Sequence, residues 1–294
     1  MSIYNKDGIQ LLSAYDVDGN ELINAYDVDG NLIFHKDAGL IKVCTYNVGG
    51  WYIGSGTNVP ANKDEAYYTL QNGMIDDIDA DILCLEEYWT TFSQSGRTAE
   101  SLLSQYYPYI QTAGGTTQYM GRAICSKYPI LSYSTNYFSV DTSRYYDVAE
   151  INVNGITVYV FVTHLSVSNQ EWKITQATEI LNYIRAHNID RFIICGDFNS
   201  TLTDPMSETN VGIYKQYLDD GCTIANDGAF GILNTSCNGA DWTNTGFAID
   251  NIIISDAFTF ESVNTDLAKI TNSTVLADGK IDHVPLYAVI SFET

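Results

Sequence analysis

Residues 192–199 read Phe-Ile-Ile-Cys-Gly-Asp-Phe-Asn, and this stretch decides how the rest of the chain is interpreted. Four apolar residues in a row are typical of a strand that is buried on both faces. The run ends at Gly196, and two polar side chains, those of Asp197 and Asn199, follow at once. A polar residue after a strand is usually part of a turn. A functional interpretation therefore requires similar residues at the ends of other strands.

Five other strand-like runs also carry polar side chains where they begin or end. Two of the four histidines, His164 and His283, lie at such positions. The other three runs meet Glu86-Glu87, Asn47 and Asp250. Because polar side chains at strand ends gather at one edge of a sheet, we expect these residues to lie close together. Turn chemistry alone is a poor explanation for this set of residues.

The pattern from residue 41 onward predicts a mixed α and β domain. Helices are predicted at residues 64–77, 98–106 and 169–187. Strands are predicted at residues 41–47, 81–86, 121–126, 147–153, 156–162, 191–196, 250–255 and 285–292. Asn154-Gly155 joins two of these strands and predicts a type I′ hairpin turn. Such an alternation indicates mixed sheets covered by helices, either as two packed sheets or as a single sheet.

An internal repeat precedes this domain. Its three units, residues 3–13, 14–24 and 25–35, carry Asp-Gly pairs at residues 7–8, 18–19 and 29–30. Asp-Gly between short strands predicts β-hairpins. A calcium loop is disfavoured, because with Gly19 at its sixth position the first position, which needs an oxygen ligand, would be Ala14. We therefore divide the chain into a hairpin-repeat segment with a linker, residues 1–40, and a main domain, residues 41–294.

The overall charge argues against loose, non-specific binding to nucleic acid or to anionic membranes. The 14 Lys and Arg residues face 36 Asp and Glu residues, which gives a formal net charge of −22. A bound divalent cation and a few local cations can still reverse the field inside one cleft. The charge therefore leaves a phosphate ester open as a substrate.

Other bulk features predict a protein without stable membrane insertion. The chain has no apolar run of about 18 residues, which a membrane-spanning helix needs. The N-terminal stretch is polar and has no apolar signal core, so the default expectation is a cytoplasmic location. Four of the six cysteines lie in strand-like runs, and we expect reduced thiols, with a Cys222–Cys237 pair as the alternative.

The residues at the strand ends match what the hydrolysis of a phosphate ester requires. A hard dication neutralises the phosphoryl oxygens and prefers carboxylate and carbonyl oxygen ligands. A base orients or deprotonates the attacking water, and an acid or a metal stabilises the leaving alkoxide. A histidine beside a carboxylate titrates near neutral pH and suits these proton transfers.

Four motifs in chain order resemble those of the endonuclease/exonuclease/phosphatase superfamily. They are Thr45-Tyr46-Asn47-Val48, Asp81-Ile82-Leu83-Cys84-Leu85-Glu86-Glu87, Gly196-Asp197-Phe198-Asn199 and Asp282-His283. This superfamily includes deoxyribonuclease I, exonuclease III, sphingomyelinases and inositol polyphosphate 5-phosphatases. The resemblance implies a four-layer α/β sandwich, in which two packed mixed sheets are flanked by helices. It covers residues 41 to 292 and leaves the N-terminal repeats outside.

The resemblance also implies a divalent metal site. Glu87 matches the principal metal ligand, Asn47 lies beside it, and Asp282 lies near the metal. The expected ion is Mg²⁺, with Mn²⁺ or Ca²⁺ as alternatives. Glu86 is expected to stand behind the ligands, because neighbours along a strand point to opposite faces and only one of them readily reaches the site.

The remaining matches imply roles in catalysis. Asp197 and Asn199 match the residues that hold the attacking water and the phosphate, and His164 matches the phosphate-binding histidine. His283 matches the final catalytic histidine, which Asp250 orients. Two weaker matches add phosphate contacts from Tyr119, in the segment Tyr119-Met120-Gly121-Arg122, and from Arg144.

The sequence favours a nuclease among the branches of the superfamily. Tyr119, Arg122 and Arg144 suit a backbone phosphate, and Trp51, Tyr52 and Trp89 suit stacking on bases. The expected substrate is therefore nucleic acid, with DNA favoured. A sphingomyelinase-like or phospholipase C-like enzyme acting on a lipid, or an enzyme acting on a small phosphodiester, remains the alternative. A non-catalytic binding module is the alternative of another class.

Overall fold

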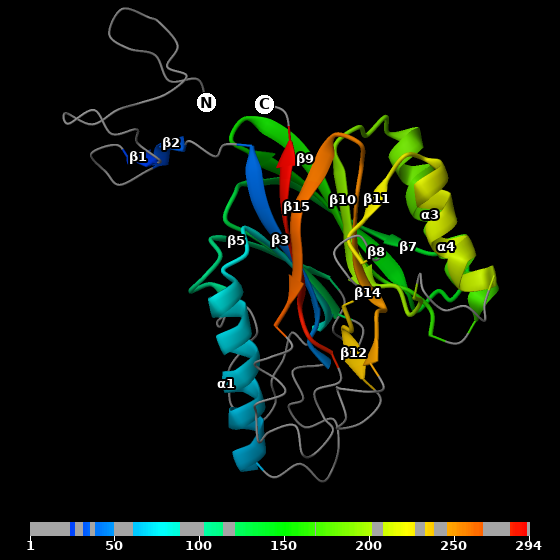
Figure 1. Ribbon diagram of the computed structural model, residues 1–294, viewed down its shortest axis with the longest axis horizontal. Helices are drawn as coiled ribbons and strands as arrows, with labels where there is room; N and C mark the ends of the chain where they lie inside the picture. Colours follow the sequence, from blue (N-terminus) through cyan, green and yellow to red (C-terminus); the bar gives the residue numbers. More distant parts are fainter. Residues whose placement is uncertain are drawn as a thin grey trace, which may run out of the picture.

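The computed structural model describes residues 24–26, 32–35, 39–49, 61–88, 103–113, 121–167, 169–201, 208–226, 233–237, 246–266 and 283–292. Two six-stranded sheets account for most of the strands (Figure 1). Short two-stranded pairs are formed by β1 (Asn24–Tyr26) with β2 (Leu32–His35) and by β12 (Ser236–Cys237) with β13 (Gly246–Phe247).

Both large sheets are mixed. The first has the order β15 (Phe258–Thr265), β16 (Leu286–Phe292), β3 (Leu40–Asn47), β4 (Ile82–Tyr88), β6 (Gly121–Ser126) and β5 (Tyr109–Ala113). The second has the order β11 (Thr223–Ile224), β14 (Asp250–Ile254), β10 (Phe192–Asp197), β9 (Ile156–His164), β8 (Tyr145–Val153) and β7 (Ile130–Tyr137). Only β3–β4 and β9–β10 pair in parallel among these strands.

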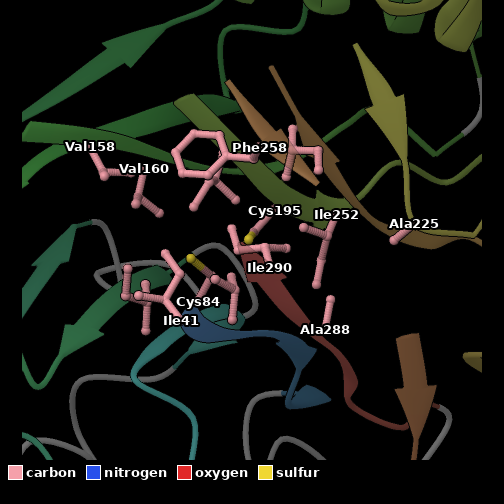
Figure 2. Packing of buried hydrophobic residues seen from close by; sticks show 14 of the residues in the cluster. Ile41, Cys84, Val158, Val160, Cys195, Ala225, Ile252, Phe258, Ala288 and Ile290 are labelled. Carbon is pink, nitrogen blue, oxygen red and sulfur yellow. The ribbon is translucent and has the colours of Figure 1, made fainter. Parts of the chain in front are cut away.

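Three hydrophobic clusters define the layers of a helix–sheet–sheet–helix sandwich. The largest lies between the two sheets, where Ile41 and Cys84 of the first sheet meet Val160 and Cys195 of the second (Figure 2). A second cluster lies between the first sheet and α1 (Ala61–Ile78). The third lies between the second sheet and α3 (Gln170–Ala186) with α4 (Glu208–Asp219). The four-layer α/β sandwich is thus confirmed, with two sheets rather than one (Figure 1).

The predicted central elements are all present, with ends shifted by a few residues. The Asn154-Gly155 turn has φ of 54° and 95°, as a type I′ hairpin turn requires. Asn169 caps α3 by accepting a hydrogen bond from the backbone N–H of Trp172. Of the helix predicted at residues 98–106, the described part begins at Leu103, which starts a short turn before β5.

The sequence analysis missed β5, β7, β15 and α4. The first three strands lie at the edges of their sheets, where one side of the strand is exposed and apolar residues are fewer. β7, for example, is half-buried or exposed along its whole length. Its sequence therefore lacks the apolar run that identifies the central strands.

Only the third N-terminal repeat has described strands. β1 and β2 pair antiparallel on either side of Asp29-Gly30, as expected for a hairpin. Apart from Asn24, the other two units fall outside the described residues, so the division of the chain at residue 40 remains a prediction. No helix among the described residues has both the length and the apolar character needed to cross a membrane. Cys222 is a buried free thiol, as are Cys44, Cys84, Cys125 and Cys195, so the alternative Cys222–Cys237 pair is not formed.

Gly196 lies where the sandwich has no room for a side chain. In the parallel β9–β10 pair it lies opposite Thr163, and a Cβ atom at this position would meet the Thr163 carbonyl oxygen at 2.2 Å. We expect Gly196→Ala to lower the free energy of unfolding by about 3 kcal/mol, because backbone in a buried sheet has little room to move. Urea denaturation measures this change.

Gly212 in α4 supplies the matched control. A Cβ atom there meets no atom closer than Ile174 Cδ1 at 3.5 Å, which is ordinary contact. Gly212→Ala should therefore raise the free energy of unfolding by about 0.5–1 kcal/mol through its helix propensity. Equal changes in the free energy of unfolding for Gly196→Ala and Gly212→Ala would contradict the close approach of Gly196 to the Thr163 backbone.

Candidate active site

The faces that the two sheets turn toward each other change from apolar to polar at one end of the sandwich. Along β10, Ile193 and Cys195 lie in the inter-sheet core, and Asp197 continues their side of the strand. The neighbouring strands change in the same way. The polar side chains that continue these faces are Asn47, Glu86, Arg122, Asp147, His164 and Asp250.

The register between neighbouring strands places these polar residues opposite one another, at the same end of each sheet. Asp197 lies opposite His164 in the parallel pair and opposite Asp250 in the antiparallel pair. In the other sheet, Asn47 lies opposite Glu86, and Glu86 lies opposite Arg122. Strands that run in opposite directions contribute their beginnings and their ends to the same edge. The strand ends singled out in the sequence therefore do lie together.

The carboxylate of Asp197 lies at the centre of this cluster. Its Oδ2 accepts a hydrogen bond from Asn47 Nδ2 at 3.1 Å, and its Oδ1 accepts one from the backbone N–H of Asn199 at 2.8 Å. The Nε2 atoms of His164 and His283 lie 3.5 and 3.7 Å from Oδ2. Burial, together with the nearby Asp250, raises the pKa of the Asp197 carboxyl to about 7. This carboxyl is thus poised to exchange a proton near neutral pH.

His283 and Asp250 form an oriented pair. His283 Nδ1 lies 2.8 Å from Asp250 Oδ2, and both side chains are buried. Because an ionised carboxylate only accepts hydrogen bonds, Nδ1 carries the proton, and Nε2 is turned toward Asp197. The backbone bridge between His283 and Ser236, and a hydrogen bond from Asp250 N–H to Thr235 Oγ1, fix both residues to the same short segment.

A β-bulge aims Glu87 into the site. By strand alternation Glu87 would follow Leu83 and Leu85, which face α1 on the outer side of the sheet. Glu87 instead has a φ of 53°, and the register of β4 against β6 shifts between Glu86 and Tyr88. Its Oε1 lies 3.3 Å from Asn47 Nδ2 and 3.9 Å from His164 Nδ1. Alternation was therefore the wrong reason to select Glu87, because the bulge redirects its side chain.

Glu86 lies deeper, on the inter-sheet face itself. Its side chain is fully buried, and Oε1 accepts a hydrogen bond from the Thr45 hydroxyl at 2.9 Å. Burial, with Asp250 nearby, raises the pKa of this carboxyl well above its usual range. Glu86 is thus packed behind the cluster, as expected.

Two arginines meet behind His164. Arg144 Nη1 and Arg122 Nη2 donate hydrogen bonds to the His164 carbonyl oxygen at 3.3 and 3.4 Å. Arg122 is buried, with its guanidinium 3.8 Å from the centre of the Tyr145 ring, whereas the Arg144 side chain keeps 12% of its surface exposed. Arg144 is therefore better placed than Arg122 to meet an incoming phosphate.

The imidazole of His164 is neutral near neutral pH. Burial is the largest cause of its lowered pKa, and the positive charges of Arg144 and Arg122 act in the same direction. A neutral imidazole carries one N–H donor and one acceptor. His164 can therefore donate a hydrogen bond to an anionic oxygen while it carries no net charge.

Asn199 is held in an unusual backbone conformation. Its φ is 48°, which asparagine tolerates better than most residues. Its Nδ2 donates to the Leu165 carbonyl oxygen at 3.0 Å, and its own carbonyl oxygen accepts a hydrogen bond from Lys173 Nζ at 2.6 Å. Lys173 escaped the sequence analysis, although it lies four residues before Ala177 on the buried stripe of its helix, where a lysine is unusual.

The donor set fits a hard divalent cation. Glu87 and Asp197 present carboxylate oxygens to the same amide, that of Asn47, and Glu87 keeps 22% of its side chain exposed for access. Mg²⁺, Mn²⁺ and Ca²⁺ prefer such oxygen ligands. Asp197, Asp250 and His283 also have ligand atoms within 4.8 Å of one another. Since Asp250 already holds His283 Nδ1, the group around Glu87 fits a cation better.

Several predicted contributors lie outside the described residues. These are Tyr119, Asp282, Trp51, Tyr52 and Trp89. The described residues bring together the other eight predicted site residues: Asn47, Glu87, Arg144, His164, Asp197, Asn199, Asp250 and His283.

Comparisons with known proteins agree with this architecture. A sequence model of the Endonuclease/Exonuclease/phosphatase family matches residues 44–270. The sequence matched none of the curated proteins with which it was compared. The human Nocturnin catalytic domain with bound sulfate anion is similar over 86% of this chain and 95% of that chain, with a TM-score of 0.64 and 18% identity. At this identity the likeness shows the fold.

Two further solved structures have the same fold. Truncated TDP2 from Caenorhabditis elegans is similar over 86% of this chain and 98% of that chain, with a TM-score of 0.62 and 16% identity. An endonuclease/exonuclease/phosphatase from Bacteroides vulgatus is similar over 86% of this chain and 99% of that chain, with a TM-score of 0.61 and 16% identity. The fold is thus shared among these proteins.

Asp147 gives the site end of the sandwich a measurable pH dependence. Burial raises the pKa of its carboxyl to about 6, although the Arg122 charge acts in the opposite direction. When folding raises the pKa of a carboxyl, the free energy of unfolding of the protein decreases as pH increases from the pKa of that group in the unfolded state to its pKa in the folded state. Between about pH 4 and pH 7, Asp147→Asn should therefore gain about 3 kcal/mol in unfolding free energy relative to the native protein. Denaturant unfolding of both proteins across this range measures the difference, and a constant difference would contradict the assignment.

Proposed function

The chain belongs to the endonuclease/exonuclease/phosphatase family, and from this premise we propose that it is a divalent-metal-dependent phosphodiesterase that cleaves nucleic acid, with DNA favoured. Members of this family are hydrolases that act on phosphoester bonds. The observation that carries the proposal is the convergence of Asn47, Glu87, His164, Asp197 and His283 from both sheets at one end of the sandwich.

Glu87 and Asn47 are the proposed metal ligands, and Asp282 is a further candidate by resemblance. A divalent cation bound there supplies positive charge to the phosphoryl oxygens. The bulge at Glu87 supports this role, because a positive φ at a glutamate costs free energy and is typical of a residue that a site requires.

Two groups are proposed to bind the phosphoryl oxygens. His164 donates an N–H as a neutral imidazole, since burial and the neighbouring arginines keep its pKa low. Arg144 supplies a positive charge and paired N–H donors, which suit the geometry of a phosphate. Burial lowers its pKa, but an arginine remains charged throughout the physiological range.

Asp197, Asn199, His283 and Asp250 are proposed to handle the attacking water. Asp250 fixes the ring of His283, so that Nε2 and the Asp197 carboxylate face each other across 3.7 Å. A water held between them can lose its proton to one of these groups and attack phosphorus, while the P–O bond to the leaving alkoxide breaks and that alkoxide takes up a proton. Asn199 orients Asp197 through its backbone N–H.

Three of the few cations of this chain lie beside the proposed catalytic residues, where they can attract an anionic substrate. Only 14 residues of the chain are Lys or Arg, yet Arg122, Arg144 and Lys173 all donate hydrogen bonds to backbone carbonyls beside the catalytic residues. Fixed cations in a buried environment act strongly on a nearby anion because little water screens them. The sulfate anion in the solved human Nocturnin catalytic domain, which has the same fold, also supports a site for a tetrahedral anion.

The proposed substrate is tested by comparing three phosphodiesters. Purified protein with Mg²⁺ or Mn²⁺ is incubated with supercoiled plasmid DNA, with sphingomyelin vesicles and with bis(p-nitrophenyl) phosphate. Nicking of the plasmid that a chelator abolishes supports the nuclease. Cleavage of sphingomyelin without plasmid nicking would move the proposal to the lipid branch, and no cleavage of any of the three would reject a phosphodiesterase.

We expect Glu87→Gln, and not Glu86→Gln, to weaken metal binding. Removing a charged ligand should raise the dissociation constant for Mn²⁺ by more than about 100-fold, which exceeds the usual effect of losing a residue behind the ligands. Glu86→Gln keeps an acceptor for the Thr45 hydroxyl and should change the constant by less than about 10-fold. Isothermal titration with Mn²⁺ measures both, and equal affinities would show that Glu87 is not the ligand.

His283→Ala is expected to lower kcat by about 10²–10⁴-fold while the protein remains folded. The pH profile of the native enzyme distinguishes two roles for the ring. A required neutral imidazole, which accepts the water proton, makes the rate fall on the acidic side. A required imidazolium, which polarises the phosphoryl oxygen while Asp197 aligns the water, makes it fall on the alkaline side. A variant with near-native kcat at saturating metal would exclude both roles.

A further inference from the structure

Lys173 is a buried cation that the catalytic roles above do not use. It lies in the first half of α3, on the stripe that continues through Ala177, Ile180 and Ile184 into the third hydrophobic cluster. Only 1% of the residue is exposed. Lysine is almost never this deeply buried unless it has a partner, so the position calls for a specific explanation.

The partner of Lys173 is the backbone of the active-site loop after β10. Its Nζ donates a hydrogen bond of 2.6 Å to the carbonyl oxygen of Asn199. Asn199 has a φ of 48° and donates its own N–H to Asp197 Oδ1 and its side-chain amide to the Leu165 carbonyl. A single ammonium group thus holds the residue that connects Asp197 with the loop after β9.

A second side chain on the same face of α3 holds the other loop. Gln176, three residues after Lys173, is fully buried, and its Oε1 accepts the backbone N–H of Ser166 at 2.9 Å. Residues three apart share one face of a helix. Helix α3 therefore fixes the loop after β9 through Gln176 and the loop after β10 through Lys173.

A contribution to fold stability does not explain why a lysine occupies this buried position. Burial lowers the pKa of Lys173, which reflects the free energy needed to keep an ammonium group away from water, while the Asp197 charge acts in the opposite direction. An unbranched apolar side chain such as methionine would occupy a similar volume without that penalty.

We propose that Lys173 is a positioning residue, which holds the Asn199 backbone in its left-handed conformation and so fixes the Asp197 carboxylate for catalysis. The inference rests on the proposed hydrolase function for its kinetic consequence. The structural part, the restraint of residues 197–201, does not depend on that function and is measured separately.

The test compares Lys173→Met with Lys215→Met in the metal-free and metal-loaded protein. Lys215 makes the matched control, because it is an exposed helical lysine paired with Asp219 on α4. Amide hydrogen exchange, followed by mass spectrometry without metal, reports on residues 197–201. Steady-state kinetics on the cleaved substrate reports kcat and KM. Lys173→Gln, which is shorter and stays polar, replaces the methionine variant if that variant does not fold.

Lys173→Met should exchange faster at residues 197–201 than the native protein and lower kcat by about 10–100-fold, with KM changed less than about threefold. Lys215→Met should match the native protein in both measurements.

Native exchange at residues 197–201 in Lys173→Met, or an unchanged kcat, would overturn the proposal. Absence of hydrolysis by the native protein would instead reject the proposed function. The exchange comparison still decides in that case whether Lys173 restrains the loop, so the two failures are distinguishable.

Discussion

A carboxylate removed from water must be surrounded by donors and cations, and the site end of this sandwich is arranged around that requirement at Asp197. Asn47 and Asn199 donate hydrogen bonds to it, and His164 and His283 flank it. These partners come from four different strands or strand ends. The parallel β9–β10 pair sets His164 opposite Asp197, and its close approach at Gly196 leaves no room for a side chain beside Thr163. The packing of these two backbones thus helps to place two of the proposed catalytic groups.

Much of this arrangement follows from sequence because strand ends in a sheet share an edge. Asn47, His164, Asp197 and Asp250 continue the inter-sheet faces of their strands, so alternation together with apolar runs is enough to group them. Glu87 is different. Alternation alone directs it toward α1, and only the bulge, which depends on tertiary contacts of β4 with β6, returns it to the site. The motif match identified the residue without the geometry that explains it.

The strands β5, β7 and β15, which the sequence failed to predict, share a physical cause. Edge strands such as β7 bury little on one side, so their residues carry no strong apolar periodicity. The burial of Lys173 was not predicted for a different reason. A charged residue within an apolar helical stripe interrupts the pattern from which buried positions are predicted. Departures from a regular pattern are expected at functional sites, since the local rule is broken there for the sake of a contact elsewhere.

The polar faces between the sheets lower stability at the end of the sandwich where the proposed catalytic residues lie. Glu86 Oε2 and the Nε and Nη1 atoms of Arg122 have no hydrogen-bond partner among the described residues, although they are buried. A fold selected for stability alone would continue the apolar core of Ile124 and Cys84 through these positions. Burial, together with the positive charges of Arg144 and Arg122, instead keeps the pKa of the His164 imidazole low, and burial, with Asp250 nearby, raises the pKa of Asp197 to about 7. In a chain of net charge −22, this local balance, rather than the overall field, decides how the site meets an anion.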